Sequence, residues 1–204
     1  FYWKKYNLND AEKSKEQISD VDKISETYSK ESQTSEASTE RSLLKKPPKI
    51  DLQIGDMFPE FQLPSTDGGY FRTNQLDQKT VIYFYPADGT ELCSIQAKGF
   101  SVVYETLTDL GLDIVGVSPD TISAHDKFRL DESILFRLLY DEGAAICDEL
   151  NLLKRPPPDD QYPLRVTFLI DHNRRSLGKW NDIDVETHSD DAISFVADIL
   201  EKAN

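Results

Sequence analysis

The chain has 204 residues, and its formal net charge of −14 is carried by residues 51–204, because residues 1–50 contain ten basic and nine acidic side chains. This length accommodates one domain of roughly 150 residues plus about 50 more. An acidic surface repels phosphate backbones, and no apolar stretch approaches the roughly 18–20 residues of a membrane span, so we expect neither nucleic-acid binding nor a spanning helix.

The first 50 residues differ in composition from the rest. Residues 9–42 are rich in Ser, Thr, Glu, Lys, Asp and Gln and contain few large apolar side chains. Such a segment buries too little surface to offset the entropy of ordering, so residues 1–50 are predicted to be a disordered, charged tail. The alternative is a weak helical stripe that folds on a partner, formed by Ile18, Val21, Ser25 and Tyr28.

The beginning of the chain carries a second signal. Residues 1–6 form an aromatic cluster with two lysines, and the first residue is Phe1 rather than methionine. We therefore expect that something upstream was removed, either a targeting peptide or a membrane-proximal flank. Two cysteines do not form a disulfide framework, which favours an intracellular, reducing compartment.

Residues 51–204 are predicted to alternate strands and helices. A hairpin is expected over residues 61–64 and 70–72, followed by a buried strand at 81–85 that ends at Pro86. A helix from Glu91 to about Leu107 follows, with Cys93 in its first turn. Free backbone N–H groups and the helix dipole favour an anion there, which for cysteine is the thiolate.

The remaining elements continue the alternation. We expect strands at 113–117 and 136–140, a hairpin over 166–170 and 176–180, and helices at 121–130, 144–150 and 190–202, with an exposed loop at 155–160. The helix that begins near residue 121 has Thr121 or Asp120 available as its cap. Alternation that ends in a hairpin and a helix predicts an α/β fold with a mixed central sheet flanked by helices.

The spacing Pro86-x-x-x-Thr90-x-x-Cys93 after an apolar strand resembles the active-site motif of the peroxiredoxin superfamily, AhpC/TSA. The flanking residues are most similar to the bacterioferritin-comigratory, or Q-type, branch. Three further segments resemble this family in the same order along the chain: 54–68, 115–128 and 165–171. The resemblance covers about residues 51–200 and implies a thioredoxin-like fold and a thiol peroxidase, an antioxidant oxidoreductase.

The resemblance also implies roles for four residues. Cys93 is expected to attack hydrogen peroxide or an organic hydroperoxide and become a sulfenic acid. Thr90 would hydrogen-bond the sulfur or the peroxide, Pro86 would shield the site from water, and Arg165 would stabilise the thiolate and the polarised peroxide. No cofactor and no metal are expected, since the three histidines lack metal-ligand spacing.

Each of these residues has a plainer interpretation. Cys93 could be a small buried hydrophobe, Arg165 could begin a strand and pair with a carboxylate, and Thr90 could be a helix cap. His125 is interpreted as a surface or packing histidine. The surrounding motif favours the functional interpretation of Cys93.

The sequence departs from the family pattern around the cysteine. Glu91 and Leu92 stand where many Q-type members have Pro-Gly, Gln96 replaces a common glutamate, and Lys98 replaces the second cysteine often found five residues on. Cys147 is the remaining candidate resolving cysteine, although a core position is favoured for it.

We therefore expect a one-cysteine cycle, with recycling by an external thiol from thioredoxin or from glutathione and glutaredoxin. The protein is expected to be a monomer or a weak dimer. The alternative is a redox sensor or binding protein with the same fold and little turnover.

Overall fold

The computed structural model describes residues 49–154 and 162–202. The predicted tail lies almost wholly outside this part of the chain, and so does the predicted loop at 155–160. Both stay predictions.

The first regular elements of the described chain form a hairpin. Strands β1 (Gln62–Pro64) and β2 (Tyr70–Arg72) pair antiparallel, with Leu63 opposite Phe71. Both of these side chains are buried, which fixes the register of so short a pair. The predicted hairpin is confirmed, and a short 3-10 turn, η1 (Thr73–Gln75), leads from it to the central sheet.

The central sheet has five strands in the order β5-β4-β3-β8-β9. Strand β3 pairs parallel with β4 and antiparallel with β8, so the sheet is mixed. Its strands, all near the predicted positions, are β3 (Lys79–Phe84), β4 (Leu112–Ser118), β5 (Arg137–Tyr140), β8 (Val166–Ile170) and β9 (Ser176–Trp180). A separate two-stranded pair, β6 (Leu153–Lys154) with β7 (Tyr162–Pro163), was not predicted.

Strand β3 is buried on both faces, and its side chains divide between two cores. Ile82 and Phe84 belong to one hydrophobic cluster, while Val81, Tyr83 and Tyr85 belong to another. Successive side chains of a strand point to opposite faces, so the sheet separates these clusters. Burying each of these large side chains contributes roughly 1.5–3 kcal/mol, which explains why the sequence shows a continuous apolar run here.

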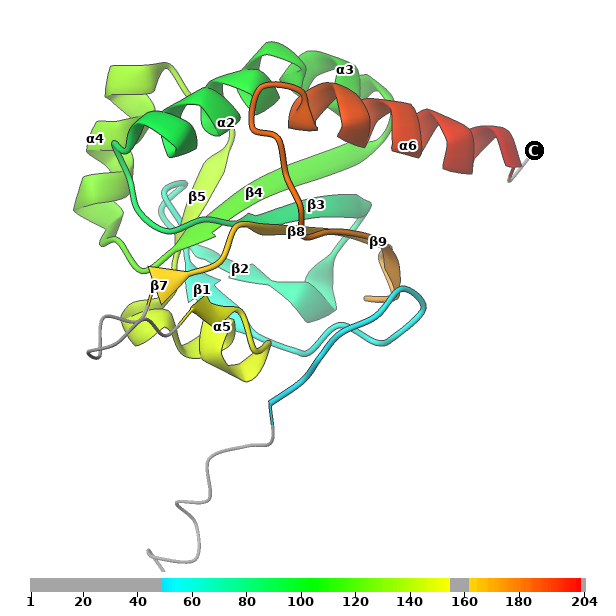
Figure 1. Cartoon of the computed structure of the whole chain (residues 1–204), viewed down its shortest axis with the longest axis horizontal. Coiled ribbons are helices and arrows are strands. Elements are labelled where there is room, and N and C mark those ends of the chain that lie inside the picture. Colours follow the sequence, from blue (N-terminus) through cyan, green and yellow to red (C-terminus); the bar gives the residue numbers. More distant parts are fainter. Residues whose placement is uncertain (1–48, 155–161, 203–204) are drawn as a thin grey trace, which may run out of the picture. The chain divides into compact units, whose positions relative to one another are not determined.

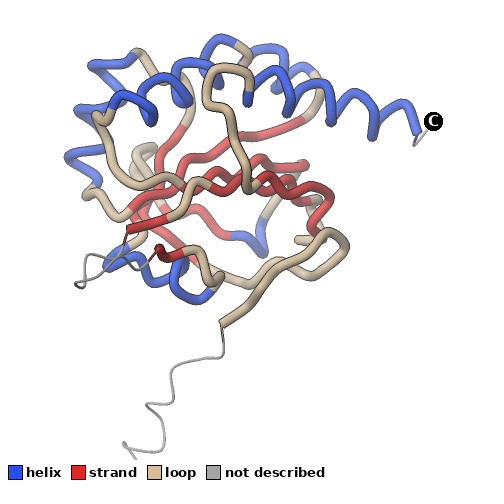
Figure 2. Tube along the Cα trace, in the orientation of Figure 1, coloured by secondary structure: helices blue, strands red, loops and turns tan. Residues whose placement is uncertain are grey.

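Different elements cover the two faces (Figure 1). Helices α2 (Glu91–Val102), α3 (Tyr104–Asp109), α4 (Ile122–Glu132) and α6 (His188–Lys202) lie on the face of Tyr83. The β1–β2 hairpin and the short helix α5 (Ala145–Glu149), which follows the 3-10 turn η2 (Glu142–Ala144), lie on the face of Phe84. Figure 2 shows the same division, with the long helices gathered on one side of the strands.

The predicted single helix from Glu91 to Leu107 is wrong, because the chain breaks at Val103. This residue has φ −97° and ψ 3° and ends α2, and α3 starts at the next residue. Gly99 and the β-branched pair Val102 and Val103 have weak helix propensity, so the backbone can bend here at little cost. The predicted apolar face is retained, since Phe100 and Leu107 are both fully buried.

The other helices follow their predicted signals. The Thr121 side chain accepts a hydrogen bond from the Ala124 N–H and caps α4, as its position indicates.

Gly116 in β4 lies under the ring of Tyr83, and a Cβ there would come 2.7 Å from that ring's Cζ and hydroxyl. The sheet order and the helices on its two faces form the predicted thioredoxin-like fold.

Candidate active site

Cys93 lies at the start of α2, directly beyond the carboxyl end of β3. The helix begins at Glu91, and Thr90 has the extended backbone of an N-cap residue. The first backbone bond of the helix runs from the Ser94 N–H to the Thr90 carbonyl, so the three N–H groups before it have no intrahelical acceptor. The cysteine therefore sits where the helix dipole and free donors favour a negative charge.

Arg165 reaches this sulfur from a distant part of the sequence. In the antiparallel pairing of β3 with β8, Phe84 lies opposite Val166, which brings Arg165 to the end of β3 where the site lies. Its Nη2 is 3.4 Å from the Cys93 Sγ. The guanidinium thus places a fixed positive charge beside the sulfur of Cys93, a residue that is only 2% exposed.

Gln96 completes this contact. It lies three residues after Cys93, on the same side of α2, and its Oε1 accepts a hydrogen bond of 2.5 Å from the Arg165 Nη1. The Gln96 side chain is buried, and its Nε2 has no hydrogen-bond partner among the described residues. A neutral amide thus orients the arginine without cancelling its charge.

Tyr83 lies beneath the site and responds to its charges. Burial raises the pKa of Tyr83 well above its usual value, the charge on Cys93 adds to this, and Arg165 opposes it. The ring stacks on Tyr85 and Phe100, with centroids 5.3 and 5.2 Å away. The side of the site that faces Tyr83 is therefore formed by packed aromatic rings.

The two motif residues before Cys93 are less tightly held. Thr90 is exposed, and its hydroxyl lies 3.5 Å from the Ala87 carbonyl; no bond from it to the sulfur or to the first turn of α2 is found among the described residues. Pro86 is half-buried at the bend that follows β3. Thr90 thus occupies the cap position without acting as a side-chain cap.

Cys147 lies on the other side of the sheet. It is fully buried in α5, in the cluster that contains Phe84, whereas Cys93 belongs to the cluster of Tyr83. Burial raises the pKa of the Cys147 thiol far above its usual value, and the nearby carboxylate of Asp141 raises it further. The structure therefore does not bring the two cysteines together.

Lys98 stands where a second cysteine often follows in the family, and it bonds across to α4. The Glu132 carboxylate receives the Lys98 ammonium and, at 2.9 Å, the Ser94 hydroxyl. The Lys98 contact, and then the Ser94 bond, lower the pKa of Glu132. This bridge ties the first turns of α2 to the end of α4.

The sequence did not indicate a contact between two polar residues near the site, Asp88 and His125. Asp88 lies in the loop between Pro86 and Thr90, and its Oδ2 is 2.8 Å from the Nδ1 of His125. His125 is fully buried, which agrees with the packing interpretation of this histidine and excludes the surface one. The two residues are 37 positions apart, so no local spacing links them in the sequence. The polar residues of the loop were the one signal that Asp88 needed a partner.

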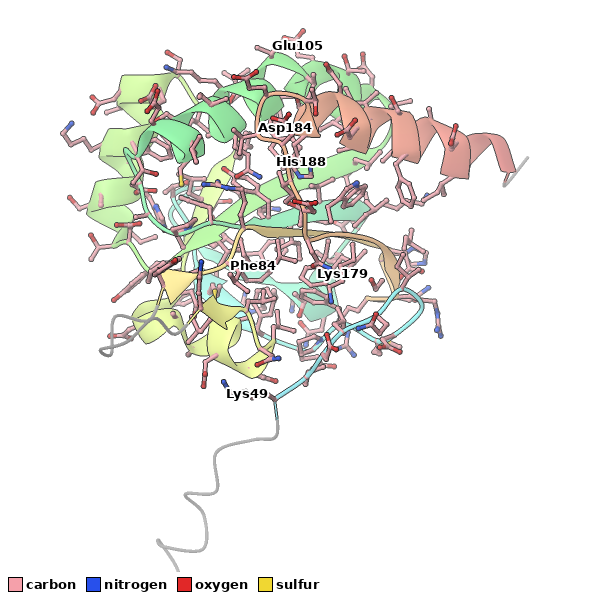
Figure 3. The ribbon with its side chains drawn as sticks, viewed as in Figure 1. Lys49, Phe84, Glu105, Lys179, Asp184 and His188 are labelled. Atoms are coloured by element: carbon pink, nitrogen blue, oxygen red, sulfur yellow. The ribbon has the colours of Figure 1, made fainter. Side chains whose placement is uncertain are left out.

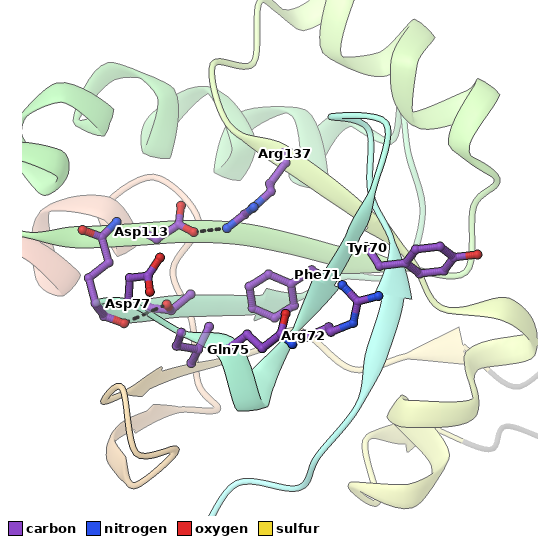
Figure 4. Close-up of a pocket in the computed structure, with 10 residues that line it drawn as sticks. Tyr70, Phe71, Arg72, Gln75, Asp77, Asp113 and Arg137 are labelled. Atoms are coloured by element: carbon purple, nitrogen blue, oxygen red, sulfur yellow. Dashed lines mark hydrogen bonds and ion pairs between the residues drawn. The ribbon is translucent and has the colours of Figure 1, made fainter.

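A separate hollow of about 230 Å³ lies at the opposite end of the strands (Figure 4). It is lined by residues from β2, η1 and the starts of β3 and β4, and Arg137 forms an ion pair with Asp113 in its wall. Since Cys93 follows the carboxyl end of β3, this hollow is not part of the cysteine site.

The described residues contain no group of three or more His, Cys, Asp or Glu side chains placed to hold a metal ion. In the same part of the chain, no helix is both long and apolar enough to cross a membrane.

Comparison with known proteins identifies similar chains. The model of the AhpC/TSA family matches residues 54–175. Peroxiredoxin Bcp of Bacillus subtilis is 30% identical over 157 residues, which are 75% of this chain and 100% of the relative. Peroxiredoxin Bcp of Escherichia coli is 29% identical over 149 residues, which are 71% of this chain and 96% of the relative.

A solved structure shares the architecture. The crystal structure of peroxidoxin BcpB from Mycobacterium tuberculosis superposes with a TM-score of 0.67 at 25% identity, covering 72% of this chain and 98% of that one. The sheet and helices around Cys93 are therefore arranged as in this solved peroxidoxin structure.

Proposed function

Because this chain belongs to the AhpC/TSA family of peroxiredoxins and is a thiol peroxidase, we propose that Cys93 is the cysteine that reduces the peroxide. The observation that carries this assignment is the 3.4 Å contact between the Cys93 sulfur and the Arg165 guanidinium. A positive charge and a helix start both favour the thiolate, which is the nucleophilic form of cysteine.

The proposed chemical step is a transfer of oxygen to sulfur. The Cys93 thiolate attacks the terminal oxygen of a hydroperoxide, so that an S–O bond forms as the O–O bond breaks. Sulfur is oxidised to a sulfenic acid, and the peroxide is reduced to an alkoxide or hydroxide that leaves as alcohol or water after taking a proton. Arg165 stabilises the negative charge as it moves from sulfur to the leaving oxygen.

Thr90 and Pro86 are proposed to serve the incoming peroxide. The Thr90 hydroxyl makes one long contact, at 3.5 Å, and is exposed beside the cysteine, so it is available to bond a peroxide oxygen. Pro86, which is half-buried at the bend after β3 and has no N–H that would need solvent, is proposed to shield the site from water. Hydrogen peroxide and organic hydroperoxides are the substrates that this group of residues favours.

Recycling is proposed to use an external thiol. The separate cores of the two cysteines support a one-cysteine cycle rather than a bridge between Cys93 and Cys147, since a disulfide needs Cα atoms within roughly 7 Å. One thiol of the reductant displaces water from the sulfenic acid to give a mixed disulfide, and a second thiol releases the Cys93 thiolate. Thioredoxin, or glutathione with glutaredoxin, is the proposed donor.

The test is peroxide consumption by the purified chain and by Cys93→Ser and Cys147→Ser variants. We expect Cys93→Ser to lose activity and Cys147→Ser to retain it with each donor. Oxidation of the wild-type thiol no faster than that of free cysteine would overturn the enzyme assignment. Fast oxidation without recycling by any donor would instead favour a redox sensor with little turnover.

Two further proposals concern the compartment and the oligomeric state. We propose that the protein acts inside the cell, in a reducing compartment, and that it is a monomer or a weak dimer. Fractionation of cells and light scattering over a range of concentrations test these two statements.

A further inference from the structure

Asp88, in the loop between β3 and α2, uses both its carboxylate and its backbone to bind neighbouring elements. Its Oδ1 accepts a 2.7 Å hydrogen bond from the Tyr85 hydroxyl, and its Oδ2 lies 2.8 Å from the His125 Nδ1. Its backbone N–H donates to the Asp120 Oδ2 at 2.9 Å. One loop residue is thus held by the end of β3, by α4 and by the turn before α4.

His125 carries this connection into the core. The ring is fully buried, and its Nε2 lies 3.1 Å from the Leu139 carbonyl of β5. Both ring nitrogens therefore face acceptors, and the two bonds form together only when a hydrogen lies between each nitrogen and its acceptor. The imidazole acts as a rigid bridge from the loop to the sheet.

The polar groups that bond to Asp88 also have partners of their own, whereas the buried Tyr83 hydroxyl nearby has none among the described residues. The Ser118 hydroxyl donates to the Asp120 Oδ2 at 2.7 Å, which orients the carboxylate that receives the Asp88 N–H. Burial raises the pKa of Tyr85 well above its usual value, and the charge of Asp88 adds to this, so the phenol remains a donor. A buried polar network that is fully bonded specifies one geometry.

The loop has few other restraints where it enters α2. Gly89 follows Asp88 with φ +68°, and the exposed Thr90 side chain makes no cap bond to the first turn of the helix. In the segment from Ala87 to Thr90, the described bonds to other elements come from Asp88, whereas α2 itself is joined to α4 through the bonds of Ser94 and Lys98 to Glu132. The loop that leads into the Cys93 turn is therefore joined to its surroundings through a residue five positions before the cysteine.

From this geometry, and on the basis of the proposed function, we infer that Asp88 and His125 are positioning residues for Cys93. They fix the loop that carries Pro86 and Thr90, and through it the first turn of α2 beside Arg165. Displacing a reacting group by about 1 Å can lower a rate by roughly 100-fold, so a loosened loop reduces reaction with peroxide even where the fold persists.

The test is a double-mutant cycle with Asp88→Ala, His125→Ala and the double variant, measured well below the unfolding temperature. The readouts are the second-order rate constant of Cys93 oxidation by hydrogen peroxide and the ultraviolet absorbance of the thiolate near neutral pH. We expect each single variant to react about 10- to 100-fold more slowly and the double variant to react no more slowly than either. Asp88→Asn, which keeps the shape and an acceptor for Tyr85, should recover most of the rate.

Two control variants separate positioning from stability. Lys127→Ala removes an exposed ion pair with Asp131 on α4 and should leave both readouts unchanged. Leu107→Ala creates a cavity in α3, in the same core layer, and should lower the melting temperature without changing the rate constant. If the Asp88 and His125 variants behave like Leu107→Ala, or if their rate losses add, the inference is overturned.

The proposed function can fail separately. Iodoacetamide reports the reactivity of the Cys93 thiolate without any peroxide. A wild-type chain inert to peroxide would refute the proposed function, whereas slower alkylation in the Asp88 and His125 variants alone would still support their positioning role. Equal alkylation rates in all variants would refute that role whatever the peroxide assay gives.

Discussion

The two cysteines of this chain show how a fold sets the reactivity of one side chain. Cys93 begins a helix on one face of the sheet, 3.4 Å from a guanidinium, while Cys147 is packed on the other face beside the carboxylate of Asp141. One site supplies positive charge and unpaired donors, and the other supplies apolar packing and negative charge. Both thiols are buried, so burial alone does not distinguish the proposed reactive cysteine from the other.

The largest expected difference is in thiol reactivity. With the native protein, iodoacetamide should alkylate Cys93 at least about 1,000-fold faster than Cys147, because burial and Asp141 keep the Cys147 thiol protonated. Mass spectrometry of peptides after timed exposure measures both rates in one sample. Comparable rates in the folded state would remove the contrast between the two sites.

Arg165 should account for much of that contrast. Arg165→Ala removes the charge beside the sulfur, and the rate constant for peroxide should fall by about 100- to 1,000-fold, as when an electrostatic donor is removed from an active site. Arg165→Lys keeps the charge but cannot bond Gln96 and the sulfur with one planar group, so it should recover only part of the rate. Stopped-flow measurement of peroxide loss tests both, and full activity in Arg165→Ala would contradict the assigned role.

The stability of the fold should fall in acid because of His188, which packs on the Cys93 side of the sheet. His188 at the start of α6 is buried against Phe100 and Trp180, and its Nε2 lies 2.9 Å from the Thr167 hydroxyl. Burial lowers the pKa of His188 to about 4 from 6.5, Asp191 opposes this, and Arg165 adds to it. Figure 3 shows His188 and Phe84 on opposite sides of the sheet.

The sign of this effect follows from proton binding. Between pH 6.5 and about 4 the unfolded chain binds a proton at His188 that the folded chain does not, so stability is full above pH 6.5 and falls as the pH is lowered. The loss should approach about 3 kcal/mol near pH 4. Urea unfolding of the wild type and of His188→Gln over this pH range measures the loss, because the carboxylates titrate in both proteins and the difference between the two is due to His188. Identical pH profiles would show that His188 contributes nothing.

The smallest expected effect comes from Gln96, which influences the thiolate fraction of Cys93 through Arg165. Gln96→Glu introduces a carboxylate of the same shape that pairs with Arg165 and opposes a negative charge on the sulfur. The thiolate fraction of Cys93 near neutral pH and the peroxide rate constant should fall together by about tenfold, and Gln96→Met, which is neutral, should not reproduce the loss of thiolate. An unchanged thiolate absorbance in Gln96→Glu would show that the charge of Arg165 is not shared in this way.

The sequence was informative where the cause is local. The buried strand that contains Tyr83, the cap at Thr121 and the position of Cys93 in a first turn all follow from neighbouring residues. The contact of Arg165 with Cys93 could be anticipated only through the family resemblance, because it depends on the pairing of β3 with β8.

Other features depend on tertiary structure and could not be predicted from these signals. The break at Val103 reflects how α2 and α3 each pack on the sheet, which helix propensity alone does not determine. The partnership of Asp88 with His125 joins a loop to a helix that pack together only in the folded chain. The face of the sheet on which Cys147 lies likewise depends on which side of the sheet the chain takes after β5.

In the proposed cycle, the near-complete burial of Cys93 limits how its sulfenic acid can be reduced. In this cycle, a protein thiol must approach the oxidised sulfur in line with the bond that breaks, and only 2% of Cys93 is exposed. The bridge from Lys98 and Ser94 to Glu132 holds the first turns of α2 in place. Turnover with a bulky reductant will therefore reach a ceiling set by how often this helix start opens, whereas oxidation will keep rising in proportion to peroxide concentration.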